Sequence, residues 1–149
     1  MSKSLPAVTV LKELVIKFGR KYAEEKRSRN SADFSDAERE LYGILVDNPE
    51  VGQRIGLQLI IVDEFQDSNR LQYEIFRHLS DNLDGLYFVG DIKQSIYGFR
   101  GAQPEVFSEI CASPEFDVLP LNENFRSDKS VIDGINTLFD RMMTEKTGG

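Results

Sequence analysis

Two adjacent carboxylates, Asp63 and Glu64, directly follow a run of mostly apolar residues at positions 57–62. In a parallel α/β sheet, ligands bind beyond the carboxyl ends of the strands, so these acids stand where a ligand would lie. One acid there can hold Mg²⁺, while its neighbour orients or deprotonates an attacking water. Acidic turns are also common, and residues 67–69 could simply cap the next helix. The pair alone is a candidate site for nucleotide hydrolysis.

A second apolar run, residues 86–89, leads into a loop that is flanked and interrupted by glycines. Gln94 offers both a donor and an acceptor at this second strand end, where a phosphate or a water could meet it. Tyr97, Phe99 and Arg100 place two rings and a guanidinium in the same loop, a composition suited to stacking bases and pairing charge. The other interpretation, aromatic side chains that fill a core, is equally compatible with the residues.

A third apolar run, residues 116–121, is followed by Arg126 just before Ser127, the predicted N-cap of the last helix. A guanidinium at such an edge can neutralise charge on a transferring phosphoryl group, although a surface salt bridge would use the same residue. Three successive strand ends therefore carry polar groups that could act on a phosphate.

Helical spacing of apolar residues predicts the elements that precede these strands. The opening segment is predicted to form an amphipathic helix that runs to about Arg27. Its apolar face consists of Val8, Leu11, Val15, Phe18 and Tyr22. A second helix is predicted to begin with a capping box at residues 35–38 and to end near Asn48 and Pro49.

The three apolar runs alternate with helical patterns, the second of which begins at Pro104. A nearly continuous apolar run such as residues 57–62 is typical of a strand that is buried on both faces of a parallel sheet. Strands that alternate with helices are joined by crossovers. The expected fold class is therefore α/β, with three parallel strands and flanking helices, preceded by helical segments.

Residues 62–67, 90–102 and 121–127 resemble three successive motifs of the UvrD/Rep family of superfamily 1 DNA helicases, beginning with the Walker B motif. Their order and their spacing of about one strand-helix unit agree with that family, and the resemblance covers roughly residues 55–140. It implies part of a RecA-like P-loop NTPase motor domain. The parent would be an ATP-dependent DNA helicase of repair and recombination, with 3′ to 5′ polarity.

Within that family, residues 91–94 and the upstream segment 33–36 are more similar to the AddA/RecB branch of helicase-nucleases. The resemblance implies that residues 1–55 form a helical segment that leads into the motor domain. Residues 56–149 would then be the C-terminal part of the first motor domain, from the Walker B motif onward. The implied partners are single-stranded DNA, the rest of the helicase chain and a second helicase-nuclease subunit.

The resemblance also implies roles for the residues at the first two strand ends. Asp63 would coordinate Mg²⁺, and Glu64 would activate the water that attacks ATP. Gln66 and Gln94 would sense the γ-phosphate and couple it to DNA. The cofactors of the full-length parent would thus be ATP and Mg²⁺.

The remaining motif residues are assigned in the same way. Phe125, where the family often has Tyr, would stack on adenine, and Arg126 would contact the γ-phosphate. Tyr97 and Phe99 would contact single-stranded DNA, and Phe99 stands where many relatives carry Trp. Arg100 would join this DNA contact or serve as a structural partner for nearby acids.

The sequence contains no G-x-x-x-x-G-K-[S/T], the loop whose N–H groups and lysine grip the phosphates of ATP. Motifs of a second motor domain and of a nuclease are absent from it too, and residues 147–149 have the composition of a loop cut by the end of the chain. We therefore expect the chain alone not to hydrolyse ATP. The alternative is a stand-alone module with a degenerate helicase fold that only binds DNA or protein.

The net charge of −7 argues against a protein that binds nucleic acid over its whole surface. Residues 1–30 hold eight Lys/Arg and three Glu, so this segment could line a DNA channel or form a solvated helix face. Cys111 and His78 are the only residues of their kinds, which excludes an internal disulfide and a Cys/His metal cluster and favours structural roles. No apolar run is long enough to span a bilayer, and a cytoplasmic location is expected.

Overall fold

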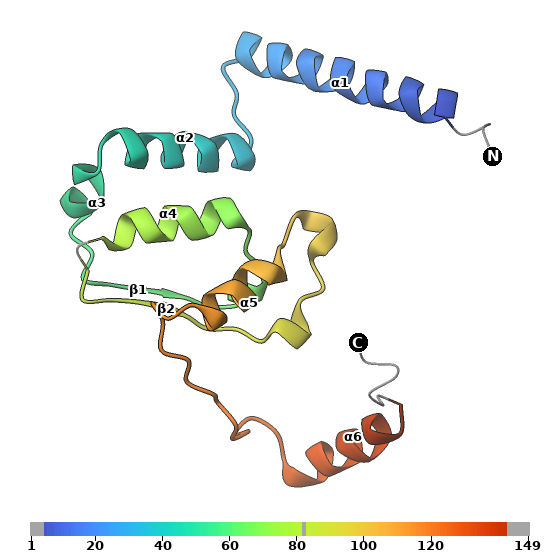
Figure 1. Cartoon of the computed structure of the whole chain (residues 1–149), viewed down its shortest axis with the longest axis vertical. Coiled ribbons are helices and arrows are strands. Elements are labelled where there is room, and N and C mark those ends of the chain that lie inside the picture. Colours follow the sequence, from blue (N-terminus) through green and yellow to red (C-terminus); the bar gives the residue numbers. More distant parts are fainter. Residues whose placement is uncertain (1–4, 82, 143–149) are drawn as a thin grey trace. The chain divides into compact units, whose positions relative to one another are not determined.

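The computed structural model describes residues 5–81 and 83–142 and divides the chain into two compact units, residues 1–115 and residues 116–149 (Figure 1). The first unit holds five of the described α-helices, two parallel strands and three short 3₁₀ helices. The second holds one described α-helix. No described helix is both long and apolar enough to cross a membrane.

The opening helix α1, Leu5–Ser28, confirms the predicted amphipathic helix. The predicted cap of the next helix is wrong by two residues, because Asp33 rather than Ser35 caps α2, Phe34–Asp47. The Asp33 carboxylate accepts the Asp36 N–H at 2.9 Å, and the Asp36 carboxylate accepts the Asp33 N–H at 3.0 Å. A carboxylate favours the positive N-terminal end of a helix, so the aspartate pair takes the place expected for Ser35 and Glu38.

As predicted, α2 ends near Asn48, which is its C-cap and whose N–H donates to Ile44 O at 2.9 Å. A short helix that the sequence pattern did not indicate follows, α3, Glu50–Ile55. Leu45 of α2 is 1% exposed, and α2 packs against both α3 and α4, Arg70–Ser80. Of these helices, α4 packs against the sheet.

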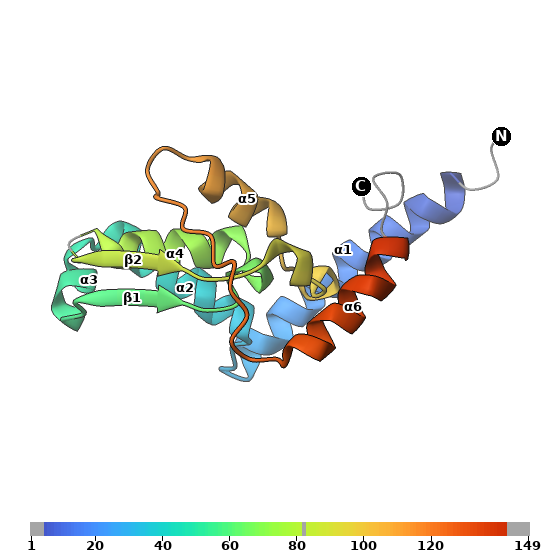
Figure 2. The same ribbon diagram turned by 90° about the horizontal axis from the view of Figure 1, so that it is seen from below.

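Strands β1, Leu59–Val62, and β2, Gly85–Phe88, pair in parallel, with Leu59 opposite Gly85 and Val62 opposite Phe88. Figure 2 shows both arrows pointing the same way beside α4, the helix that joins them. This confirms the parallel crossover. Burial on both faces is not found, because Ile61 is 62% exposed and alternating residues of β1 are open to solvent.

The core of the first unit lies between the sheet, α4 and α5, Pro104–Ala112, the helix predicted to begin at Pro104. Its apolar members, besides Leu45, are Phe65, Tyr73, Ile75, Val106, Phe107 and Ile110. Helix α5 packs against two 3₁₀ helices, η1, Phe65–Asp67, and η2, Ile92–Gln94. These are the segments that follow the two strands.

The predicted third strand, residues 116–121, is wrong: among the described residues the sheet contains β1 and β2 only. Leu119 and Leu121 are 80% and 86% exposed, and Pro120 has no N–H to donate to a ladder. Helix α6, Lys129–Met142, confirms the last predicted helix. Its first turn is capped by Asp128, which accepts the Ser130 N–H at 2.8 Å, and not by Ser127.

Candidate active site at the carboxyl end of the sheet

Asp63 and Glu64 form the turn that leaves β1, and both side chains are exposed. Glu64 has φ 52° and ψ 39°, a left-handed conformation that few residues other than glycine adopt. Its N–H donates to the Asp63 carboxylate at 2.8 Å. Strained backbone that the surrounding structure maintains is typical of functional sites, and here it turns two carboxylates outward at a strand end.

Phe65, the residue after this turn, packs in the core. Its side chain is 1% exposed, and its ring centroid lies 4.1 Å from that of Phe88 and 5.5 Å from that of Phe107. The Phe65 N–H donates to Val89 O at 2.9 Å, and the Val89 N–H donates to Val62 O at 2.9 Å. Parallel pairing thus continues past both strands, so the two strand ends are fixed to one another.

Gln66 is the only fully buried polar side chain among the described residues, at 1% exposed. Its Nε2 donates to the Glu64 carboxylate at 2.7 Å, and its Oε1 accepts the Asp91 N–H at 3.0 Å. A β-carbon at Gly90 would lie 2.4 Å from that Oε1, so this close approach requires glycine. Gln66 therefore links the carboxylates after β1 to the segment after β2.

Asp91 begins η2 and accepts the Lys93 N–H at 3.0 Å. Partial burial by itself would raise the pKa of Asp91, but hydrogen bonds from the Lys93 backbone, the Lys93 side chain and Gln94 outweigh it and lower that pKa. Gln94 is exposed, and its Nε2 donates to Asp91 at 3.3 Å. The structure therefore places Gln94 at the same edge as the carboxylates, as the sequence predicts.

Tyr97, Phe99 and Arg100 form a cluster around η3, Gly98–Arg100. The two ring centroids are 5.9 Å apart, and the Arg100 Cζ lies 4.9 Å from the Tyr97 ring and 5.6 Å from the Phe99 ring. Phe99 is 81% exposed and Tyr97 is half-buried. The Phe99 ring therefore does not fill a core and presents a surface on which a planar group can stack.

The loop that carries Tyr97, Phe99 and Arg100, here named the aromatic loop, is hydrogen-bonded at both ends to the segment that follows the carboxylates. The Ser95 hydroxyl donates to Gln66 O at 3.2 Å, and the Gln103 N–H donates to Ser68 O at 2.9 Å. The Gln103 side chain accepts the Arg70 N–H at 2.9 Å, at the start of α4. Sequence reasoning missed Ser95 and Gln103, because no local pattern signals contacts with residues so distant in the chain.

Asn69, not Asp67, caps α4: its side chain accepts the Gln72 N–H at 3.0 Å. One oxygen of Asp67, Oδ1, is buried and has no hydrogen-bond partner in the described part of the chain. The alternative that residues 67–69 cap the helix is thus correct for Asn69, while Asp63 and Glu64 take no part in capping.

Phe125 and Arg126 belong to the second unit. Phe125 is 89% exposed, and the Asn124 side chain accepts the N–H groups of Arg126 and Ser127, both at 3.0 Å. This turn leads into α6. The structure describes the second unit by itself, so the adenine and γ-phosphate contacts of these two residues stay predictions.

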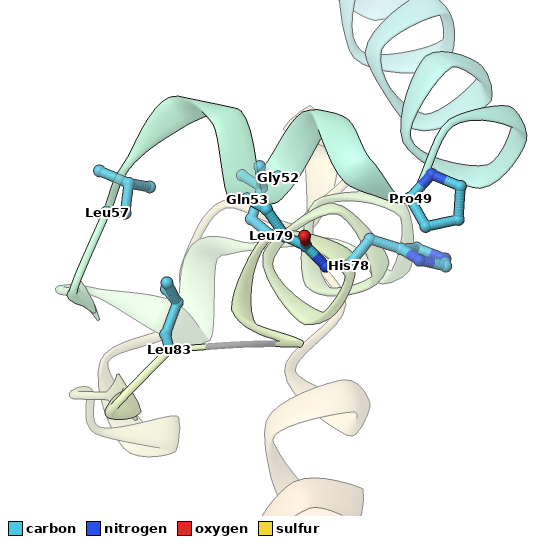
Figure 3. Close-up of a pocket in the computed structure, with 7 residues that line it drawn as sticks. All are labelled: Pro49, Gly52, Gln53, Leu57, His78, Leu79 and Leu83. Atoms are coloured by element: carbon cyan, nitrogen blue, oxygen red, sulfur yellow. The ribbon is translucent and has the colours of Figure 1, made fainter.

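A pocket of about 240 Å³ lies at the opposite end of the sheet, where α3 meets the end of α4 (Figure 3). Its lining includes Leu57 and Leu83, which precede the strands, and His78. His78 also meets the Tyr42 ring edge-on, at 5.6 Å between centroids, as expected of a structural residue. Cys111 is exposed. This pocket is separate from the carboxylates, and the candidate site is an open edge.

The carboxylates at this edge are donor groups of the kind that Mg²⁺ takes. No group of three or more His, Cys, Asp or Glu residues with metal-binding geometry occurs among the described residues. Mg²⁺ is ordinarily held by one or two carboxylates together with substrate phosphates and water. Exposed Asp63 and Glu64 match that pattern.

Comparison with known proteins agrees with the resemblance seen in the motifs. The family model of the UvrD/REP helicase N-terminal domain matches residues 2–114. An ATP-dependent helicase/nuclease subunit of Ruminiclostridium cellulolyticum is 38% identical over 96% of this chain. Proteins with the same description are 39% identical in Ligilactobacillus salivarius over 98% of the chain and 41% identical in Carboxydothermus hydrogenoformans over 91%.

The chain spans 13% of the length of the first and second of these relatives and 12% of the third. The match of the family model nevertheless covers most of the chain and includes both strand ends and the aromatic loop. The resemblance predicted from residues 62–67 and 90–102 is therefore confirmed, and the chain belongs to the UvrD/REP helicase family.

Proposed function

We propose that this chain supplies the carboxylates and the coupling loop of the ATP-hydrolysing motor in an ATP-dependent DNA helicase. One observation carries the proposal: buried Gln66 bonds to the Glu64 carboxylate on one side and to the Asp91 N–H on the other. Most buried polar side chains in folded proteins are hydrogen-bonded, as Gln66 is at both ends of its amide. Gln66 thus joins the hydrolytic edge to the loop that carries Tyr97 and Phe99.

The chain would form part of a RecA-like P-loop motor domain, with residues 1–55 leading into it and residues 56–149 forming its part from the Walker B motif onward. The relatives are each described as one subunit of a helicase/nuclease, which supports a parent that works on DNA together with another subunit. By family resemblance its movement would be 3′ to 5′. The sequence holds no phosphate-gripping loop, so turnover requires residues from the longer protein.

Asp63 would hold Mg²⁺, which lowers the negative charge of the phosphates when it is bound. Glu64 would accept a proton from the attacking water, with its carboxylate oriented by the 2.7 Å bond from Gln66 Nε2. Gln94 would contact the phosphate or the water from the second strand end, and Arg126 would add positive charge. Each of these groups except Arg126 stands at the carboxyl edge of the described sheet.

The decisive test is Glu64→Gln in the full-length protein that contains this chain. Gln retains the shape of Glu but cannot act as a base, so DNA-stimulated ATP hydrolysis is expected to fall by about 10²-fold or more. Glu40→Gln, at an exposed position of α2, is the matched control and should leave the rate unchanged. Retention of full ATPase activity by Glu64→Gln would reject the proposed base.

DNA contact is tested separately through Phe99. Replacement of an exposed stacking ring by Ala is expected to weaken binding of single-stranded DNA by about 5- to 150-fold, from about 1–3 kcal/mol per stacked base. Ile96→Ala, at a 69% exposed position of the same loop, removes apolar surface without a ring and should have little effect. Equal affinities of these two variants would remove Phe99 from the DNA site.

The two tests together also separate a motor from a binding module. Loss of DNA affinity in Phe99→Ala, combined with normal ATPase activity in Glu64→Gln, would support a module that only binds DNA. Purified chain with Mg²⁺, ATP and single-stranded DNA is expected to release no phosphate above background. Robust turnover by the chain would contradict the requirement for the missing loop.

A further inference from the structure

We propose that Asp91 is a positioning residue that sets which way the amide of Gln94 faces. This inference rests on the proposed function of the site, because it concerns how Gln94 is presented there. The observation is the bond from Gln94 Nε2 to Asp91 Oδ2 at 3.3 Å, next to the bond from the Lys93 N–H to Asp91 Oδ1 at 3.0 Å. One carboxylate therefore serves both η2 and the side chain at its end.

The chemistry of the pair fixes the orientation of the amide. An ionised carboxylate only accepts hydrogen bonds, whereas a glutamine amide has a donating and an accepting end. The Nε2 end of Gln94 must therefore face Asp91. Its Oε1 and its second N–H are left for other partners. Against the opposing effect of burial, hydrogen bonds lower the pKa of Asp91 below its ordinary acidic value, so the carboxylate remains an acceptor at neutral pH.

Asp91 is itself held by the buried part of the site. Its N–H donates to Gln66 Oε1 at 3.0 Å, and Gln66 Nε2 donates to the Glu64 carboxylate at 2.7 Å. Gln66 is oriented by the same rule as Gln94, because the Nε2 of Gln66 also faces a carboxylate, that of Glu64. An ordered series of hydrogen bonds thus runs from Glu64 through Gln66 and Asp91 to Gln94, across the two strand ends.

Asp91→Asn in the full-length protein separates orientation from support of the helix. The remaining Oδ1 of Asn can still accept the Lys93 N–H, but its Nδ2 would meet Gln94 Nε2, donor against donor. Gln94 must then turn over or detach. The ion pair of Asp91 with Lys93 is solvent-exposed and contributes little, so the exposed hydrogen bond to Gln94 is the main interaction lost. We therefore expect kcat to fall by about 3- to 10-fold, with the KM for ATP changed less than about twofold. Asp91→Ala removes the bonds to the Lys93 N–H and to Gln94, together with the Lys93 ion pair, and serves as the structural comparison.

Two measurements distinguish a positioning role from a structural one. Single-turnover hydrolysis is measured for Asp91→Asn in the wild-type and Gln94→Ala backgrounds, so that slow variants remain quantifiable. The effect of Asp91→Asn should vanish when Gln94 is already absent. Backbone hydrogen exchange of residues 92–94 should be unchanged in Asp91→Asn and faster in Asp91→Ala, because only Ala loses the bond to the Lys93 N–H.

The inference is overturned if Asp91→Asn has no effect, or has the same effect in both backgrounds. It is also overturned if η2 exchanges as fast in Asp91→Asn as in Asp91→Ala, since the loss would then be structural. Failure of the proposed function has a different signature, namely normal turnover in both Glu64→Gln and Gln94→Ala. Loss of turnover in Glu64→Gln together with a silent Asp91→Asn rejects this inference alone.

Discussion

Gly90 is the position where a single methyl group should damage the site most directly. A β-carbon there would lie 2.4 Å from Gln66 Oε1, 3.1 Å from Phe107 Cε1 and 3.2 Å from the Gln66 backbone nitrogen. The Phe107 ring and the backbone nitrogen are both buried in the core and cannot give way cheaply. Gly90→Ala must therefore displace the Gln66 amide from its bonds to Glu64 and Asp91.

The cost follows from those contacts. A buried amide left unsatisfied costs about 1–3 kcal/mol, and overpacking of a core costs about 1–3 kcal/mol. Because Glu64 is exposed and regains water, we expect the free energy of unfolding of Gly90→Ala to fall by about 2–4 kcal/mol. With a slope of about 2 kcal/mol per molar urea, the unfolding midpoint should drop by about 1–2 M.

Urea unfolding of the chain, followed by circular dichroism, measures this shift. Gly98→Ala is the matched control, because a β-carbon at Gly98 has no atom within 4 Å and lies in the same loop region. Its midpoint should equal that of the wild type or exceed it slightly. If Gly90→Ala unfolds at the same urea concentration as Gly98→Ala, then the close approach of Gly90 to Gln66 does not constrain the site, and the reasoning is refuted.

Three further predictions concern the helices around the site. Asn69→Ala should lower the free energy of unfolding by about 1 kcal/mol in the same assay, because the Gln72 N–H loses its 3.0 Å hydrogen bond to the cap. An unchanged midpoint would show that the cap contributes nothing to stability. Gly43→Ala should raise the free energy of unfolding by about 0.5–1 kcal/mol, since Gly43 lies within α2 with open space around it. A loss of stability in this variant would contradict the prediction. Lys26 of α1 bonds to Asp33 and Asp36 of α2 at 2.9 and 2.5 Å and lowers the pKa of Asp33 to about 2. A lowered carboxyl pKa stabilises the folded state above the ordinary value of 3.8, and this contribution is lost as pH falls toward about 2. NMR titration of the Asp33 carboxyl should therefore give a midpoint at about pH 2, and a midpoint near 3.8 would exclude a stabilising Lys26–Asp33 pair.

Most helices and the parallel pair of strands could be predicted, because their signals are local. The apolar spacing of α4 and α5 follows the helical repeat, and Pro104 fixes a helix start through its own ring geometry. The run that became β1 is apolar throughout, and the intervening helix implies a parallel partner. The family was also readable, because its motifs are contiguous stretches of sequence.

The predictions of the α2 cap and of the third strand were wrong for two different reasons. At the cap, two local signals compete, and at the strand, a neighbouring strand is required. Ser35 with Glu38 and Asp33 with Asp36 both have capping spacing, and the backbone conformation of Asp33 decided between them. Residues 116–121 are apolar enough for a strand, yet an apolar run forms one only when a neighbour accepts and donates its backbone hydrogen bonds. The apolar pattern of residues 116–121 does not show whether such a neighbouring strand is present.

The sequence by itself determined where the candidate catalytic groups lie: Asp63, Glu64 and Gln94 stand at strand ends because apolar runs set the strands before them. Only the tertiary structure decided how the two strand ends are linked. Gln66 is buried and linked to both ends, and Gly90 leaves room for it, through contacts between residues that are some 25 positions apart. Such contacts depend on the packing of β1 against β2, so no local pattern of residues can specify them.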